Sequence, residues 1–361
     1  MRFLKEFASK RFRIALCGSI ATLWSWAATT SAQSGSSIPA APPVFREVTD
    51  EAGRTVRIPQ PVRRIVSLAP SLTETVYALG LADHLVGDTD YCDYPPDAQK
   101  KTKVGGGINP SLEEIASLHP DVVLVTKKFN RLETVHALET LGISSYATDP
   151  HTVDEIISSS KRLADVLGAP DAGASIAEVM QQHLSNLQEH ISALPPKRVL
   201  FVVWTQPLIS VGKGTFIADA LRRAGAVSVV DSEQDWPQVS LEEVARLQPD
   251  FLVFADSDSA SPAVETLATL PGWSMVDAVG NRRFAVISEA VNRPAPRIVS
   301  AIEDLARQLH PDAFVEKPKN SKGKIEKENP PPSQRRASHD SYSPHAREGY
   351  LTIPGGQACA H

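Results

Sequence analysis

Aromatic side chains that could hold a flat ligand lie in loops that follow predicted strands. The segment DTDYCDYPP places Tyr91 and Tyr94 in one such loop, and SEQDWPQVS places Trp236 in another. Trp204 ends a predicted strand at residues 198–204. Aromatic rings offer a large apolar area with a polar edge, so these four residues suit a bulky ring ligand. For Tyr94 and Trp204, packing within a loop or the core is an equally good explanation.

Motifs of the common catalytic and metal sites are missing. No GxSxG, HExxH, CxxC or GxGxxG pattern occurs in the sequence. The string VGKGTF at 211–216 echoes a phosphate loop but lacks the glycine required before Lys213, which favours a strand-to-helix turn. The ten histidines are scattered without ligand spacing. We therefore expect no catalytic residues, no metal ligands and no resident cofactor.

An eleven-residue segment occurs twice. Residues 111–121 read SLEEIASLHPD and residues 240–250 read SLEEVARLQPD, identical at eight positions, and each copy runs into an apolar, strand-like stretch. A repeat separated by a full domain length indicates two similar lobes rather than a solenoid.

Capping boxes are predicted at three helix starts. In each repeat the serine is the expected N-cap, and Glu114 or Glu243 is the glutamate that completes the box. The segment Ser71–Glu74 has the same pattern ahead of a helix at 73–79.

Strands that alternate with helices in both halves predict an α/β fold with two Rossmann-like lobes and parallel sheets. The N-terminal lobe is expected at 63–168 and the C-terminal lobe at 196–314. Between them, residues 169–195 carry apolar side chains at spacings of three and four, which predicts one long connecting helix. About 22 helical residues span roughly 33 Å, so we expect a stiff rod and little closure of the lobes.

The termini carry different signals. Residues 1–32 combine a basic start, an uncharged apolar run and a small-residue cleavage site, which indicates a signal peptide and a periplasmic protein. An uncleaved membrane anchor is the alternative, because the run is close to spanning length. Residues 33–62 are expected to form a linker and a hairpin, and residues 315–361 a disordered tail. Cys92 and Cys359 are expected to be free thiols.

Charge excludes one class of partner. The formal net charge is −5 and no basic face is evident, so we expect no nucleic-acid binding. We also expect a monomeric protein.

Four features together resemble the periplasmic cobalamin- and ferric-siderophore-binding proteins of ABC importers, the class III family with a helical backbone. They are DYCDYPP, KVGGGINPSLEEIASLHPDVVL, WPQVS and the long helix, and the resemblance covers about 63–309. The DYCDYPP and WPQVS segments look most like the cobalamin-binding branch. The resemblance implies two lobes, no catalysis, a small-molecule ligand between the lobes, and delivery to a dimeric permease with its ATPase.

A corrinoid is the expected ligand, and haem or a ferric siderophore is the alternative within transport. A chelatase-like enzyme on the same scaffold, or an envelope interaction module that uses the charged tail, would be a different class of function.

The resemblance also implies roles for single residues. Tyr91 matches a tyrosine that stacks on the ligand, Trp236 matches a tryptophan of the second lobe, and Arg293 lies near a cleft arginine. Glu113 and Glu242, the first glutamates of the two repeats, match glutamates that dock on the permease.

Two departures from the family pattern predict a more open pocket. The glycine run 105–107 stands where some cobalamin binders have a cleft tryptophan, and Ala290 and Val291 replace bulky aromatic residues.

Overall fold

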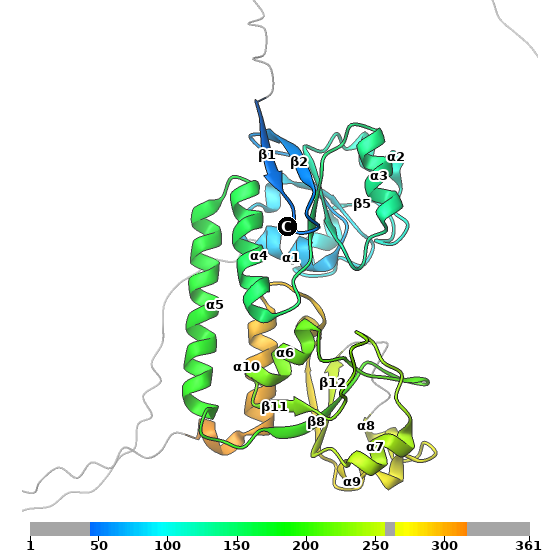
Figure 1. Ribbon diagram of the computed structural model, residues 1–361. Helices are drawn as coiled ribbons and strands as arrows, with labels where there is room; N and C mark the ends of the chain where they lie inside the picture. Colours follow the sequence, from blue (N-terminus) through cyan, green and yellow to red (C-terminus); the bar gives the residue numbers. More distant parts are fainter. Residues whose placement is uncertain (1–43, 257–263, 316–361) are drawn as a thin grey trace, which may run out of the picture. The chain divides into compact units, whose positions relative to one another are not determined.

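A computed structural model describes residues 44–256 and 264–315 of the 361-residue chain. The predicted signal peptide, most of the predicted linker, the tail beyond 315 and Cys359 lie outside the described residues. No helix in the described part is long and apolar enough to cross a membrane. The described residues form two parallel sheets and two small hairpins (Figure 1).

A hairpin precedes the first lobe. Strands β1 (Val44–Thr49) and β2 (Thr55–Gln60) pair antiparallel. In the turn, the Asp50 carboxylate accepts hydrogen bonds from the backbone N–H groups of Ala52 and Arg54 at 3.0 and 2.8 Å. Gly53 has a φ of 80°, a conformation that glycine adopts without steric cost.

The first lobe is built on a five-stranded parallel sheet in the order β5-β4-β3-β6-β7. Apart from the edge strand of two polar residues at 102–103, its strands are short and almost fully buried, as expected for strands covered on both faces. The elements are β3 (Ile65–Ser67), α1 (Pro70–Ala78), η1 (Ala82–His84), β4 (Leu85–Asp88), η2 (Pro96–Lys100), β5 (Thr102–Lys103), α2 (Leu112–Ser117), β6 (Val122–Thr126), α3 (Leu132–Thr140), β7 (Ser145–Thr148) and α4 (Val153–Val166).

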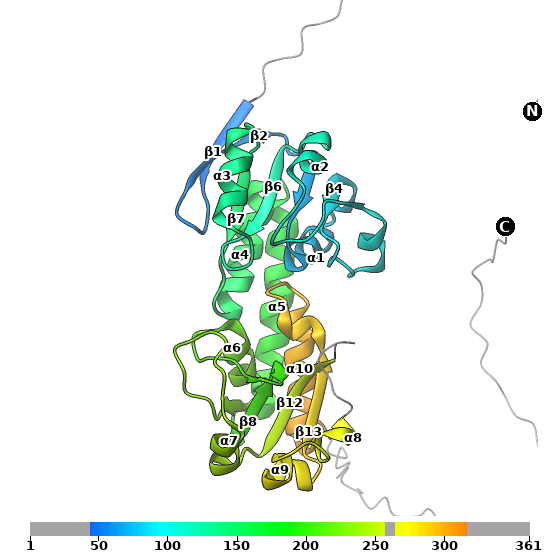
Figure 2. The ribbon, with the colours of Figure 1, turned by 90° about the vertical axis from the view of Figure 1, so that its right-hand side faces the viewer.

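The second lobe has a four-stranded parallel sheet in the order β11-β8-β12-β13, with α10 beside it (Figure 2). Its strands are β8 (Lys197–Val202), β11 (Ala226–Ser228), β12 (Phe251–Asp256) and β13 (Phe284–Ser288), and β9 (Trp204–Thr205) with β10 (Leu208–Ile209) forms a small hairpin. Its helices are α6 (Phe216–Arg223), α7 (Leu241–Leu247), α8 (Val264–Leu267), η3 (Trp273–Met275), α9 (Asp277–Gly280), η4 (Glu289–Asn292), α10 (Ile298–Leu309) and η5 (Pro311–Phe314).

One long helix, α5 (Pro170–Ile191), joins the two lobes, which confirms the predicted fold class. Its buried face carries Met180, Leu184, Leu187 and Ile191, the side chains that the periodicity indicated. Leu194 lies beyond the end of the helix and is 37% exposed, so the apolar stripe stops one turn earlier than predicted.

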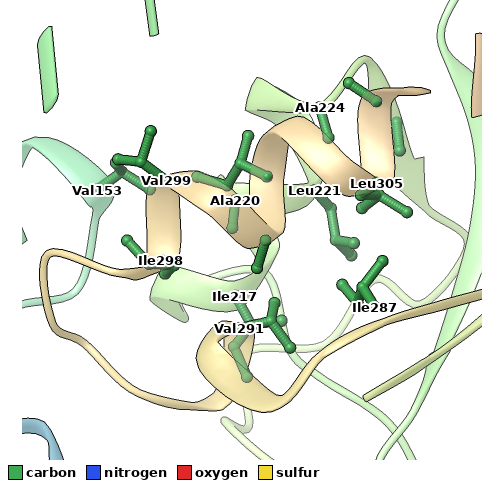
Figure 3. Packing of buried hydrophobic residues seen from close by; sticks show 14 of the residues in the cluster. Val153, Ile217, Ala220, Leu221, Ala224, Ile287, Val291, Ile298, Val299 and Leu305 are labelled. Atoms are coloured by element: carbon green, nitrogen blue, oxygen red, sulfur yellow. The ribbon is translucent and has the colours of Figure 1, made fainter. Parts of the chain in front are cut away.

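Helix α4 adds a second connection, which the sequence did not indicate. Its first residue, Val153, is fully buried in the hydrophobic core of the second lobe, and Figure 3 shows it beside Val299. The backbone N–H of Val153 donates to the Asp219 carboxylate at 2.8 Å, and Asp154 pairs with Arg223 at 2.6 Å. Two helices, rather than one, therefore link the lobes.

The repeat makes equivalent contacts in both lobes. The Asp121 carboxylate accepts a hydrogen bond from the backbone N–H of Arg64 at 2.8 Å, and the Arg64 side chain donates to the Leu118 carbonyl at 2.8 Å. In the second lobe, Asp250 and Arg198 form the matching backbone bond at 2.8 Å. The Arg198 side chain likewise donates to a carbonyl at the end of α7. The aspartate of each repeat thus ties its helix to the first strand of its sheet.

The predicted capping boxes form only in part. Ser111 and Ser240 are N-caps. Their hydroxyls accept hydrogen bonds from the backbone N–H groups of Glu114 and Glu243 at 3.2 and 3.1 Å. The Glu243 carboxylate does not complete the box, because it pairs with Arg246 at 2.6 Å.

The box predicted at Ser71 is wrong. Helix α1 begins at Pro70, with Ala69 as its N-cap and Ser71 inside the first turn. Proline suits the first helical position because its missing N–H would have no partner there.

Glu74 instead joins the lobes. Its side chain is only 3% exposed and binds Arg293 and Arg297 of the second lobe, each at 2.8 Å. Arg297 also donates through Nε to the second carboxylate oxygen at 3.0 Å. Asp93 and Glu289 contact Arg293 from the outside at 2.7 and 3.3 Å. A buried carboxylate between two guanidinium groups is the main polar contact of this junction.

Removal of this carboxylate should destabilise the protein. Glu74→Ala leaves two largely buried guanidinium groups without their central partner, and we expect a loss of about 3 kcal/mol in the free energy of unfolding. Urea denaturation measures the loss, and Asp97→Ala, which removes an exposed pair with Lys100, should leave the midpoint almost unchanged. Equal midpoints for the two variants would contradict a structural role for Glu74.

Candidate ligand-binding cleft

A cavity of about 460 Å³ lies between the lobes, within the usual range for small-molecule sites. The first lobe supplies the residues that follow β3, β6 and β7, at the carboxyl ends of its parallel strands, where open α/β sheets bind ligands. The second lobe supplies the start of α6, the segment before the repeat, and η4 with the residues after it. The lining residues are Ala69, Pro70, Ser71, Thr126, Lys128, Phe129, Thr148, Asp149, Pro150, His151, Thr215, Phe216, Asp235, Trp236, Glu289, Asn292, Arg293 and Pro294.

Another hollow, of about 510 Å³, is less suited to a ligand. It lies among α4, α5 and α6 and is lined by helical residues such as Asp154, Gln188 and Arg223. It contains no aromatic side chain and touches no strand end, so we assign the site to the cavity between the lobes.

Two of the predicted ligand residues line this cavity. Trp236 is 51% exposed and stands in the segment before the second repeat. Arg293 also lines it, but its guanidinium is held by Glu74, Asp93 and Glu289. Burial alone would lower the pKa of Arg293, yet these carboxylates outweigh burial and raise it, so the group stays charged.

The other three predicted residues lie outside the lining. Tyr91 is 62% exposed, and its ring faces Gly106, where a Cβ would lie 3.7 Å from the ring. Tyr94 packs under the Arg297 guanidinium, 3.8 Å from the ring centre. Trp204 is exposed on β9 and donates its indole N–H to the Gln206 carbonyl at 2.8 Å.

Several lining residues were missed by the sequence reasoning. Lys128 and Phe129 follow β6, and Asp149 and His151 follow β7. Because every strand of this sheet is parallel, its carboxyl ends meet at one edge, and that rule alone would have identified these loops.

The structure corrects the prediction that the glycine run and Ala290 with Val291 would make the pocket more open. The Phe129 ring occupies the space beside Gly107, because a Cβ added there would lie 2.2 Å from Cε1 of that ring. Ala290 and Val291 are fully buried in the core of the second lobe and do not line the cavity.

The charges around the cavity are paired. Lys128 binds Asp235 of the other lobe at 2.7 Å, and its ammonium lies 3.3 Å from Nδ1 of His151. Asp149 is held by Lys127, which does not line the cavity, at 2.8 Å. Lys128 and Arg293, the lining lysine and arginine, therefore both have a carboxylate partner in the described structure.

A partly buried lysine, Lys103, holds the loop that carries Tyr91. The Lys103 ammonium binds the Asp88 carboxylate at 2.8 Å and donates to the carbonyls of Thr89 and Cys92 at 3.2 Å each. Burial raises the pKa of Asp88 to about 6, although Lys103 acts in the opposite direction. Cys92 is a buried free thiol whose pKa is raised by the same desolvation.

Among the described residues, no group of three or more histidine, cysteine or acidic side chains could hold a metal ion.

The raised pKa of Asp88 predicts a pH dependence of stability. The pKa of the Asp88 carboxyl is about 6 in the folded chain against an ordinary value of 3.8, so the folded chain binds this proton more tightly than the unfolded chain does. The free energy of unfolding therefore falls as the pH rises between these two values. We expect Asp88→Asn to remove this contribution, on the order of 2 kcal/mol between about pH 4 and 6. Unfolding curves across this range test it, with exposed Asp312→Asn as the control, and parallel profiles for wild type and Asp88→Asn would refute it.

The sequence matches the family model of periplasmic binding proteins over residues 65–291. A vitamin B12-binding protein of Yersinia pestis is 32% identical over 251 residues, covering 69% of this chain and 87% of that protein. An uncharacterized ABC transporter substrate-binding lipoprotein of Bacillus subtilis, YvrC, is 32% identical over 277 residues, with coverages of 74% and 87%.

Solved structures agree with these matches. The periplasmic vitamin B12 binding protein BtuF of Vibrio cholerae superposes with a TM-score of 0.61 at 30% identity, covering 70% of this chain and 98% of that one. The periplasmic heme-binding protein RhuT of Roseiflexus gives a TM-score of 0.64 at 25% identity, with coverages of 70% and 99%. With two lobes on one long helix and a cavity between them, this chain belongs to the periplasmic binding protein family, the substrate-binding proteins of ABC importers.

Proposed function

We propose that this protein binds a corrinoid in the cavity between its lobes and delivers it, in the periplasm, to a dimeric permease with its ATPase. The vitamin B12-binding relatives support this ligand class. The cavity adds Trp236 and Phe216 from one lobe and Phe129 from the other, which offer flat apolar faces to a ring.

The observation that carries the proposal is the pairing of the lining charges. A ligand with several negative charges, such as a ferric catecholate siderophore, needs cations that are free to meet it. Here Lys128 and Arg293 are each bound to carboxylates, and the carboxylates of Asp149, Asp235 and Glu289 also line the cavity. A neutral macrocycle with amide groups at its edge makes no such demand.

Haem is the second candidate. Tyr91 is 62% exposed beside the glycine run and has a phenolic oxygen that could ligate iron, and haem-binding proteins are among the structural relatives. The propionates of haem, however, would compete with Asp235 and Glu289 for the two lining cations.

Direct titration tests the ligand. We expect cyanocobalamin to quench tryptophan fluorescence with an affinity that changes less than about twofold between roughly 0.05 and 0.5 M salt, because a neutral ligand is hardly screened. Trp236→Ala should weaken binding about tenfold or more. Phe45→Ala, which removes an aromatic ring of similar exposure on β1, should have no effect.

Tight binding of haemin with no response to cyanocobalamin would show that the ligand is haem and would refute the corrinoid. An unchanged affinity in Trp236→Ala would instead refute the assignment of the site.

The repeats also support a role in docking. Glu113 and Glu242 are exposed, at equivalent positions in the first turns of α2 and α7, and neither has a hydrogen-bond or ion-pair partner among the described residues. Glu243, in contrast, is occupied by Arg246. Two equivalent free carboxylates suit a two-fold symmetric permease that presents the same basic pocket twice.

Substitution separates docking from ligand binding. We expect Glu113→Ala with Glu242→Ala to keep the affinity for cyanocobalamin but to reduce uptake strongly in vesicles that contain the permease and its ATPase. Lysine at both positions should reduce uptake further through repulsion from basic side chains.

The matched control is Glu114→Ala with Glu243→Ala, which changes the neighbouring glutamates and should leave uptake nearly normal. Normal uptake by the double lysine variant would show that Glu113 and Glu242 are only helix-terminal charges.

A further inference from the structure

Two aromatic rings, those of Phe129 and Tyr91, pack against the glycine run 105–107. A Cβ at Gly107 would meet Cε1 of Phe129 at 2.2 Å and the backbone carbonyl of Leu68 at 2.8 Å, so no side chain fits there while the Phe129 ring is in place. At the neighbouring Gly106, the nearest atom within 4 Å of an added Cβ belongs to the Tyr91 ring, at 3.7 Å. Both rings therefore lie against bare backbone.

Asn130 fixes the loop that carries Phe129. Its side chain is buried, and its amide donates to the carbonyls of Leu68 at 2.9 Å and Gly107 at 2.8 Å. Its side-chain oxygen accepts the backbone N–H of Thr126 at 2.7 Å. One amide thus ties the end of β3, the glycine run and the end of β6 together, directly beside Phe129.

Phe129 nevertheless keeps a free face. The side chain is 41% exposed and lines the cavity, although an apolar ring of this size is normally buried. A ring that is held by its backbone and exposed toward a cavity loses little conformational entropy when a ligand stacks on it.

We propose that Phe129 is the ring-stacking wall of the first lobe, that it meets the flat face of the macrocycle while Trp236 contacts the ligand from the second lobe, and that Gly107 and Asn130 are its positioning residues. This inference rests on the proposed function. It also explains the glycine run, because Phe129 supplies the aromatic surface from a different loop and needs the space that Gly107 leaves.

Affinity measurements with cyanocobalamin test the wall. Phe129→Ala should weaken binding at least tenfold, and Phe129→Tyr should restore most of the affinity because the ring is kept. The matched control is Leu132→Ala, which removes an exposed apolar side chain three residues further on, outside the cavity, and should bind like wild type.

A double-mutant cycle tests the positioning. Gly107→Ala should displace the ring and weaken binding in the wild-type background, and should weaken it much less once Phe129 is alanine, when only the contact of the new Cβ with the Leu68 carbonyl remains. Asn130→Ala should behave in the same way. A purely structural effect would lower the affinity equally in both backgrounds, which would overturn the positioning role.

The outcomes also separate this inference from the proposed function. If Trp236→Ala loses affinity while Phe129→Ala binds normally, the wall is refuted and the corrinoid site stands. If the wild type binds haemin instead, the corrinoid is refuted. The affinities of the same Phe129 variants for haemin then test whether Phe129 stacks on the ligand. If neither ligand binds, both proposals fail.

Discussion

The carboxylate of Glu74 is the interaction on which the arrangement of the two lobes depends. A buried charge is costly unless it is paired and hydrogen-bonded, and both partners of Glu74 come from the other lobe. The junction therefore cannot open without exposing or orphaning charged groups. The α4 helix acts in the same direction, because its first turn is part of the core of the second lobe. Together these contacts give a physical basis for a stiff molecule that the long helix alone would not provide.

The same network shapes the cavity. Because Arg293 is engaged by carboxylates, the positive charge nearest the lobe junction is not available to a ligand. Lys128 is engaged by Asp235 in the same manner on the other side. What the cavity then offers is aromatic surface, supplied by Trp236 and Phe129 from opposite lobes. Under the proposed function, this division of roles would favour a ligand by its shape and flatness rather than by its charge.

Periodicity and the repeat were sufficient to predict two lobes with parallel sheets and the long helix between them, because these features depend on local patterns of apolar residues. The second connection, through α4, was not predicted. The site was predicted less completely. Trp236 and Arg293 line the cavity, but Phe129 was missed, because its place beside Gly107 depends on two loops that are distant in sequence. The capping box at Ser71 failed for a related reason: Glu74 satisfies its charge with arginines more than 200 residues away, a contact that no local pattern encodes.

The duplication of α2 as α7 bears on how a partner would recognise this protein. Each lobe presents an exposed glutamate at the same point of the same motif, and two helices fix the lobes to one another. For a partner that engages both lobes, the second contact forms within a complex that already exists, so an effective concentration governs it rather than the bulk one. Avidity of this kind is sensitive to the spacing of the two contacts, and individually weak contacts then suffice to distinguish one arrangement of the lobes from another.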